Sequence, residues 1–141
     1  MKLLIATDGS ENALNAVRFA ANILGKCSQP GSITLISVND TAAQHFARRS
    51  VGQHAADDYL HAQSQHDFAE ARALLDGAGI PHETLIRNGH VASEIVAAAD
   101  EGQFDMIVLG SKGRGTFTDL LVGSVATRVS EMARIPVLLV R

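Results

Sequence analysis

The sequence predicts an α/β fold, a three-layer sandwich in which a five-stranded parallel sheet carries two helices on each face. Apolar stretches rich in β-branched residues recur five times along the 141 residues, and helical patterns fill every gap between them. Such alternation of strand and helix implies right-handed crossovers and a sheet that is covered on both faces. The continuously apolar stretches at residues 3–5 and 137–140 agree with strands buried on both faces.

Each of the five predicted strands ends where a turn or a helical pattern begins. In chain order the strands are Lys2–Thr7, Ser32–Val38, Glu83–Arg87, Asp105–Leu109 and Pro136–Val140. We expect Ser10 to cap the first helix and Gly25 to end it, and Gly79 and Pro81 to stop the second. Residues 39–53 are polar and irregular, which suits a mobile loop or a poorly packed helical turn.

Apolar residues spaced by three or four positions mark the helix faces that we expect to contact the sheet. They are Leu14, Val17, Ala21 and Leu24 in the first helix; Leu60, Phe68, Ala71, Leu75 and Ala78 in the second; Ala92, Ile95, Val96 and Ala99 in the third; and Val122, Val125, Val129 and Met132 in the fourth.

Length and composition narrow the range of functions. A chain of 141 residues fits one domain, so we expect a single domain over residues 1–141. The net charge of −3 and the aromatic content of 4% give little support for nucleic-acid binding. The single cysteine, Cys27, excludes an internal disulfide, and no apolar run approaches the roughly 20 residues that span a bilayer. We expect a cytoplasmic protein that does not insert into membranes.

The most informative motif is the glycine-rich stretch at residues 110–115, which follows an apolar strand and is completed by Gly123 and Ser124. Glycine lets the backbone approach a ligand closely and adopt positive φ angles, so that successive N–H groups converge on one anion. The helix that begins near Gly123 adds unpaired N–H groups and the positive end of its dipole. The two segments therefore predict a phosphate-binding site.

The position of this site predicts the order of the strands. Asp8-Gly9-Ser10 ends the first strand, and ligands of open α/β sheets bind beyond the carboxyl ends of strands where the strand order reverses. If Asp8 and Gly110 line one crevice, the first and fourth strands are neighbours. The predicted sheet order is therefore 3-2-1-4-5.

The common nucleotide-binding fingerprints are absent. The sequence contains no G-x-x-x-x-G-K-[ST], and the spacing of Gly110, Gly113 and Gly115 does not fit the dinucleotide loop. A response-regulator receiver would need an acidic pair after the first strand, where this chain has Thr7-Asp8-Gly9.

The spacing of Gly110, Gly113, Gly123 and Ser124 resembles that of nucleotide-binding members of the universal stress protein family, which carry G-x-x-G, nine residues, then G-[ST]. The resemblance extends from residues 4–10 through 78–80 to 135–141. It implies an adenine nucleotide alpha hydrolase-like fold, the ATP-binding subgroup of the family, and ATP with Mg as the ligand.

The resemblance also implies a role for each matching residue. Adenine would contact Ala6, Thr7 and Val38, and the ribose would lie near Gly110 and Ser111. Asp8 would lie near the ribose or near Mg bound to the phosphates. The residues expected around the phosphates are Gly113, Arg114, Gly123, Ser124 and Val125. Lys112 and Gly115 of the same glycine-rich stretch are further candidate ligand residues, outside what the resemblance implies.

Some of these positions allow a second interpretation. Lys112 stands where related chains commonly have histidine, and it is either an extra phosphate ligand or a flexible exposed lysine. Ser124 is either a ligand or a simple helix cap. His54, Asp58 and His61 share one helix face at a spacing that a metal ion would accept, although a solvated surface is the more common outcome.

Three functions fit the sequence. The first is an ATP-dependent regulatory module of the stress response. The second is a slow ATPase or autophosphorylating enzyme, for which the sequence indicates no catalytic residue and, beyond Asp8, no carboxylate placed to orient water or bind a metal ion. The third is a nucleotide-free dimeric adaptor. Residues 135–141 form an apolar strand at the predicted edge of the sheet, which favours a homodimer through Ile135–Arg141.

Overall fold

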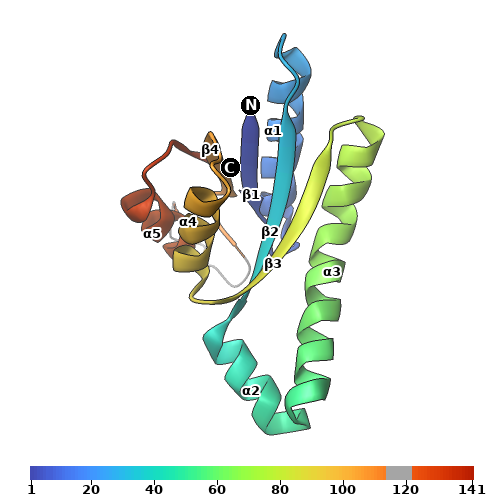
Figure 1. Cartoon of the computed structure of the whole chain (residues 1–141), viewed down its shortest axis with the longest axis vertical. Helices are drawn as coiled ribbons and strands as arrows, with labels where there is room; N and C mark the ends of the chain where they lie inside the picture. The colour runs from blue at the N-terminus through green and yellow to red at the C-terminus, as the bar shows by residue number, and fades with distance from the viewer. Residues whose placement is uncertain (114–121) are drawn as a thin grey trace.

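A computed structural model, in which residues 1–113 and 122–141 are described, has the predicted three-layer architecture (Figure 1). In chain order its described elements are β1 (Lys2–Ala6), α1 (Glu11–Lys26), β2 (Ser32–Asp40), α2 (Thr41–Val51), α3 (Gln53–Gly77), β3 (His82–Gly89), α4 (Val91–Glu101), β4 (Met106–Gly110), α5 (Ser124–Met132) and β5 (Val137–Val140). The predicted strand ends agree with these bounds to within two residues.

The sheet is parallel and has the order β3-β2-β1-β4-β5, which confirms the predicted topology. β1 lies at its centre, where it pairs with β2 from Lys2↔Ser32 to Ala6↔Ile36 and with β4 from Leu3↔Met106 to Ile5↔Val108. The carboxyl ends of β1 and β4 therefore lie side by side, at the point where the strand order reverses.

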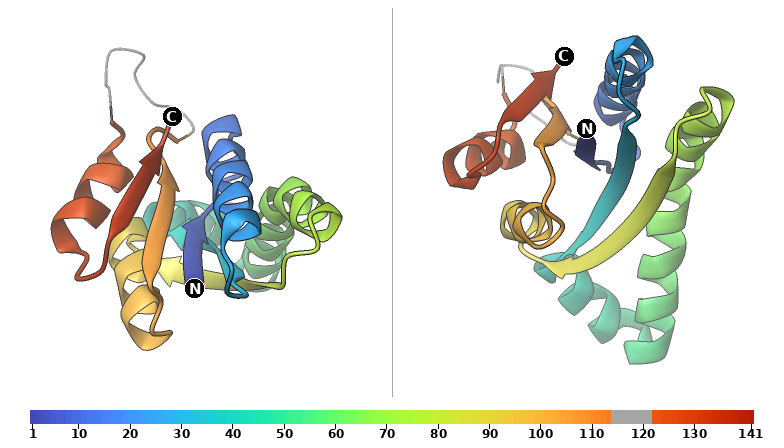
Figure 2. Two further views of the ribbon diagram at one scale, coloured as in Figure 1. Left: turned by 90° about the horizontal axis from the view of Figure 1, so that it is seen from above. Right: turned by 45° about the horizontal axis from the view of Figure 1, so that its top comes forward.

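Two apolar cores lie on opposite faces of the sheet because successive side chains of a strand point to opposite sides. Leu3 and Ile5 of β1 pack with residues of α1 and α3, whereas Leu4 packs with residues of α4 and α5. Figure 2 shows these two helix pairs on either side of the sheet. Burial of each large side chain contributes about 1.5–3 kcal/mol. The prediction of two helices on each face is thus confirmed, and α2 is an additional helix.

The prediction of a loop or a poorly packed helical turn at residues 39–53 was wrong. β2 continues to Asp40, α2 occupies Thr41–Val51, and α3 begins at Gln53. The Asp40 side chain caps α2 by accepting a hydrogen bond from the Ala42 N–H at 2.8 Å, and Gly52 ends it with a φ of 83°. Ala47 is buried, and α2 packs against α3. Both helices extend beyond the end of the sheet (Figure 1).

The predicted inner face of the last helix was also wrong at three positions. Val129 is buried, but Val122, Val125 and Met132 are exposed, and Ala126 is the other buried residue of α5. α5 packs on the sheet near β4 and β5, at the edge of the sheet. Ala126 and Val129 are therefore enough to form its contact with the core. Ala78 is likewise exposed, because it is the C-cap of α3. The other predicted inward residues are buried, except for the partly buried Ala21.

No helix within the described ranges is both long enough and apolar enough to cross a membrane.

Candidate functional site

A cavity of about 440 Å³ lies at the carboxyl ends of the central strands. This volume is within the range of small-molecule sites, about 300–1,000 Å³. Its lining combines residues from the ends of β1, β2 and β4 with the first turns of α1, α4 and α5. The lining residues are Ala6, Thr7, Asp8, Ser10, Ala13, Ile36, Val38, Val91, Ile95, Leu109, Gly110, Ser111, Lys112, Gly113, Gly123, Ser124, Val125 and Ala126.

The two glycine segments meet at one wall of this cavity. The Gly123 N–H donates a hydrogen bond to the Ser111 carbonyl oxygen at 2.6 Å, and the Ser111 N–H donates to the Val140 carbonyl oxygen at 2.7 Å. A Cβ atom on Gly123 would lie 3.5 Å from Lys112 Cα and 3.8 Å from Gly113 N. The start of α5 is therefore fixed directly against the chain that leaves β4.

Close backbone approach explains why glycine occupies position 110, whereas at Gly113 the near atom belongs to a side chain. A Cβ atom on Gly110 would lie 2.7 Å from the Asn12 carbonyl carbon and 2.8 Å from its oxygen, so a side chain there would push α1 away from β4. A Cβ atom on Gly113 would lie 2.9 Å from Asp8 Oδ2. Neither residue has a positive φ. The expected positive φ occurs instead at Gly9, where φ is 76°.

The turn after β1 is held by its own side chains. Asp8 Oδ1 accepts a hydrogen bond from the Ser10 N–H at 2.9 Å, and Thr7 Oγ1 accepts one from the Gly9 N–H at 3.2 Å. Ser10 Oγ then caps α1 by accepting a hydrogen bond from the Ala13 N–H. These contacts place the Asp8 carboxylate beside Gly113. Charge and backbone amide groups thus come together at this end of the cavity.

Ser124 is not the cap of α5. The N-cap is Gly123, which makes no side-chain capping hydrogen bond, and Ser124 is the first residue of the helix. Amide groups in the first turn of an α-helix have no partner within the helix, and the helix dipole places partial positive charge there. Because Gly123, Ser124 and Val125 line the cavity, this positive end of α5 lies at its surface.

Much of the remaining lining of the cavity is apolar. Ile36, Val38, Val91, Ile95 and Leu109 line it, and they come from the ends of β2 and β4 and from α4. The cavity therefore has two chemically distinct halves, one of aliphatic side chains and one of amide groups with Lys112 and Asp8.

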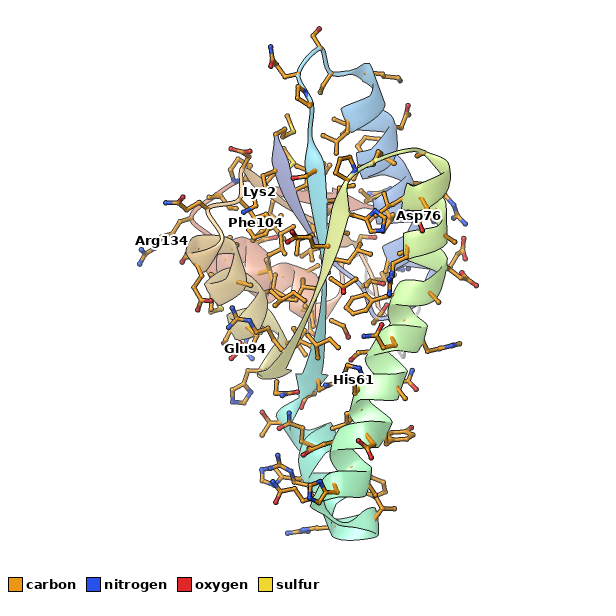
Figure 3. The ribbon with its side chains drawn as sticks, turned by 45° about the vertical axis from the view of Figure 1, so that its right-hand side comes forward. Lys2, His61, Asp76, Glu94, Phe104 and Arg134 are labelled. Atoms are coloured by element: carbon orange, nitrogen blue, oxygen red, sulfur yellow. The ribbon has the colours of Figure 1, made fainter. Side chains whose placement is uncertain are left out.

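Ion pairs fix α4, which supplies part of the apolar half, to β3. Arg87 of β3 forms ion pairs with Glu94 and Glu101 of α4, at 3.8 Å for Glu94. Figure 3 shows Glu94 on α4 beside the end of β3. The hydrogen bond to Glu101, with the negative charges of Glu101 and Glu94, raises the pKa of Arg87 above its ordinary value.

The structure brings together all the predicted site residues that it describes, since every one of them lines this cavity. They are Ala6, Thr7, Asp8, Val38, Gly110, Ser111, Lys112, Gly113, Gly123, Ser124 and Val125. The predicted residues Arg114 and Gly115 lie outside the described residues. Within the described ranges, no three histidine, cysteine or acidic side chains are placed to hold a metal ion, so His54, Asp58 and His61 do not form a site.

Seven residues of the lining, most of them apolar, were not predicted from the sequence. They are Ser10, Ala13, Ile36, Val91, Ile95, Leu109 and Ala126. Their common feature is position, because each lies at the end of a strand or in the first turns of the helix that follows one. The rule that ligands bind beyond the carboxyl ends of strands could have identified them once the strand order was predicted.

Comparisons with known proteins agree with this architecture. The family model described as "Universal stress protein family" matches residues 1–141. Universal stress protein MJ0531 of Methanocaldococcus jannaschii is 29% identical over 140 residues, which cover 99% of this chain and 81% of that protein. A universal stress protein of Thermus aquaticus is 31% identical over 145 residues, covering 99% of this chain and 97% of that protein.

Solved structures extend the comparison to three dimensions. The structure of hypothetical protein MJ0577 has a TM-score of 0.86 with 25% identity, covering 99% of this chain and 94% of that one. More distant family structures hold adenine nucleotides, namely an Archaeoglobus fulgidus protein with dAMP and an Arabidopsis thaliana protein with AMP. Those two are 22% and 16% identical to this chain, so their likeness shows the fold alone. This chain belongs to the universal stress protein family.

Proposed function

We propose that this protein binds ATP together with Mg and acts as a nucleotide-dependent regulatory module, in the form of a homodimer. The observation that carries the proposal is the hydrogen bond from the Gly123 N–H to the Ser111 carbonyl oxygen, because it fixes the start of α5, with its first-turn amide groups, at the wall of the cavity. A ligand that suits this cavity needs an anionic part for that end and a flat apolar part for the other. An adenine nucleotide has both.

The two halves of the cavity suggest how the nucleotide lies. The base would pack between Val38 and the α4 residues Val91 and Ile95, because these side chains form the apolar wall. The phosphates would lie at the start of α5, where the helix dipole and the amide groups favour negative charge. Family members with bound AMP and dAMP support an adenine nucleotide as the ligand class.

The chemistry of the lining supports a metal ion held mainly by the phosphates. Within the described lining, Asp8 is the one carboxylate, and Lys112 is the one cationic side chain. A single carboxylate is a typical protein contribution to Mg that is otherwise bound by phosphate oxygens and water. Asp8 would contact the metal, and Lys112 would neutralise phosphate charge. When bound, Mg supplies charge neutralisation to the triphosphate.

The edge of the sheet supports a dimer. Ile107 and Ser111 donate backbone hydrogen bonds to Pro136 and Val140, so in this parallel ladder the backbone groups of alternate β5 residues point away from β4. All four residues of β5 are only partly buried. An apolar edge of this kind is commonly covered by a second chain, and a two-fold axis would pair the two copies of β5 antiparallel.

Isothermal titration with ATP in the presence and absence of Mg tests the ligand directly, and native mass spectrometry of protein purified without added nucleotide tests ligand and subunit number together. We expect a dimer that carries or takes up adenine nucleotide. A ligand present at 100 times its Kd stabilises the folded state by about 2.7 kcal/mol, so saturating Mg-ATP should also raise the Tm. Absence of both titration heat and thermal shift would overturn the proposal.

A further inference from the structure

A chain of hydrogen-bonded side chains lies between β2 and α3, on the face of the sheet opposite the cavity. Ser37 Oγ donates to Ser64 Oγ at 3.2 Å, and Ser64 Oγ donates to Asn39 Oδ1 at 3.3 Å. Asn39 Nδ2 in turn donates to Asn88 Oδ1 of β3 at 3.0 Å. Ser64 is fully buried in α3. Its hydroxyl therefore holds two residues of β2 at once.

The two residues that Ser64 holds lie on either side of Val38. Because side chains alternate along a strand, Ser37 and Asn39 point toward α3, whereas Val38 points toward α4 and lines the cavity. Ser64 thus contacts the back of the same stretch of chain whose front forms the apolar wall.

Among the described strands, this stretch of β2 pairs with a neighbouring strand on one side only. The pairing of β1 with β2 ends at Ala6↔Ile36, and the last backbone hydrogen bond between them runs from the Thr7 N–H to the Ile36 carbonyl oxygen at 2.9 Å. From Ser37 to Asp40, β2 pairs with β3 alone within the described residues. The backbone at Val38 is therefore an edge on the side of β1, and the two hydrogen bonds through Ser64 restrain the residues on either side of it from the α3 face of the sheet.

We propose that Ser64 is a positioning residue for the nucleotide base: it fixes the backbone at Val38 so that the Val38 side chain packs against the flat face of a purine. This inference rests on the proposed function. Replacing Ser64 by alanine removes the acceptor for the buried Ser37 hydroxyl and the donor for Asn39, and buried polar groups that lose their partners are costly. The wall at Val38 then loses its fixed position, while the start of α5 is unaffected.

The test compares three probes on wild-type protein and on Ser64→Ala by isothermal titration. ATP and AMP both carry the base, whereas inorganic tripolyphosphate reports the phosphate end alone. We expect Ser64→Ala to weaken ATP and AMP by the same factor, about fivefold, which corresponds to the loss of one or two hydrogen bonds. Binding of tripolyphosphate should stay within about twofold of the wild type.

Two further variants separate positioning from loss of stability. Leu75→Val removes volume from the buried core of α3 far from the hydrogen-bonded chain, and it should lower stability without changing the affinity for any probe. Asn39→Leu removes the acceptor at the partly exposed end of the chain, and it carries the same test if Ser64→Ala fails to fold.

The outcomes are distinct. Wild-type protein that binds none of the three probes overturns the proposed function, and the role of Ser64 with it. Wild-type protein that binds ATP, combined with an equal affinity of Ser64→Ala or of Asn39→Leu for ATP, overturns the role of Ser64 alone. An equal loss for tripolyphosphate and ATP overturns it as well, because that loss would report general destabilisation.

Discussion

The backbone N–H of Gly123 lies 2.6 Å from the carbonyl oxygen of Ser111, and this contact joins two parts of the chain that are distant in sequence. Ser111 also donates its own N–H to Val140, so both of its backbone groups are used to connect β4, β5 and α5. The backbone of Ser111 is therefore structural. Its contribution to a ligand would come from its side chain, which is mostly buried.

Replacing Gly123 by proline should weaken nucleotide binding. The φ of −70° at Gly123 suits proline, but the ring Cδ would replace the N–H and point at the Ser111 carbonyl oxygen, so the hydrogen bond is lost and the start of α5 must move away from Ser111. The loss of one hydrogen bond costs about 1 kcal/mol and the displacement adds to it, so we expect at least about a fivefold loss of ATP affinity by isothermal titration.

Gly123→Ala is the matched control for this variant. Its Cβ would lie 3.4 Å from the Ser111 carbonyl oxygen, which is an ordinary contact, and the N–H remains. An equal affinity of the alanine and proline variants for ATP would show that the hydrogen bond does not shape the site.

Replacing Gly110 by alanine should destabilise the fold. The added Cβ would approach the Asn12 backbone to 2.7 Å, so α1 must shift against β4. Overpacking of this kind costs about 1–3 kcal/mol, measured as a lower midpoint of urea unfolding.

Gly25→Ala is the contrasting variant, because it lies in α1, the helix that packs against β4, and should raise stability. Nothing lies within 4 Å of the new Cβ, and Gly25 is inside α1, so the substitution should stabilise the protein by about 0.5 kcal/mol through helix propensity. If Gly110→Ala leaves the midpoint unchanged or raises it as Gly25→Ala does, close packing is not the reason for glycine at position 110.

The sequence was sufficient to predict the sheet and its order. The apolar stretches are long enough to identify buried strands, and the expectation that Asp8 and Gly110 share a crevice requires β1 and β4 to be neighbours. The prediction failed at α2, a mostly polar helix that packs against α3, the helix directly after it in the chain. Within its described side chains only Ala47 is buried, so no run of large apolar residues marks the segment as helical, and its stability depends on packing against α3.

The sequence was also not sufficient to predict which face of α5 packs on the sheet, or why glycine occupies positions 110 and 113. Two apolar stripes share Val129, one through Val125 and Met132 and one through Ala126, and periodicity alone does not say which of them faces the sheet. The larger residues face outward because α5 covers the sheet only near its edge. At Gly110 and Gly113 the constraint is a neighbouring atom rather than a positive φ, which no local pattern reveals.

Replacing Asp8 by asparagine should separate metal from nucleotide binding. The amide oxygen of asparagine can still accept the hydrogen bond from the Ser10 N–H, so the turn after β1 is preserved while the negative charge is removed. With Mg present, ATP affinity should fall because a metal ligand is lost. With the metal chelated, ATP should bind about fivefold more tightly than to the wild type, since a like charge near the phosphates is gone.

Titration with and without EDTA measures both effects for Asp8→Asn. A variant whose affinity rises or falls equally in the two conditions would exclude Asp8 from contact with the metal.

Replacing Met132 by glutamate should break the proposed dimer without unfolding the monomer. Met132 is 44% exposed near the end of α5, and α5 packs beside β5, so a second copy that pairs with β5 would bury it. A buried and unpaired carboxylate opposes association strongly. Sedimentation equilibrium should show at least a tenfold weaker dimer, by about 1.4 kcal/mol or more.

Phe46→Glu is the control, because Phe46 is 74% exposed on α2, outside the sheet, and its replacement should leave the dimer intact. Dimers of unchanged strength in the Met132 variant would place the interface elsewhere on the molecule.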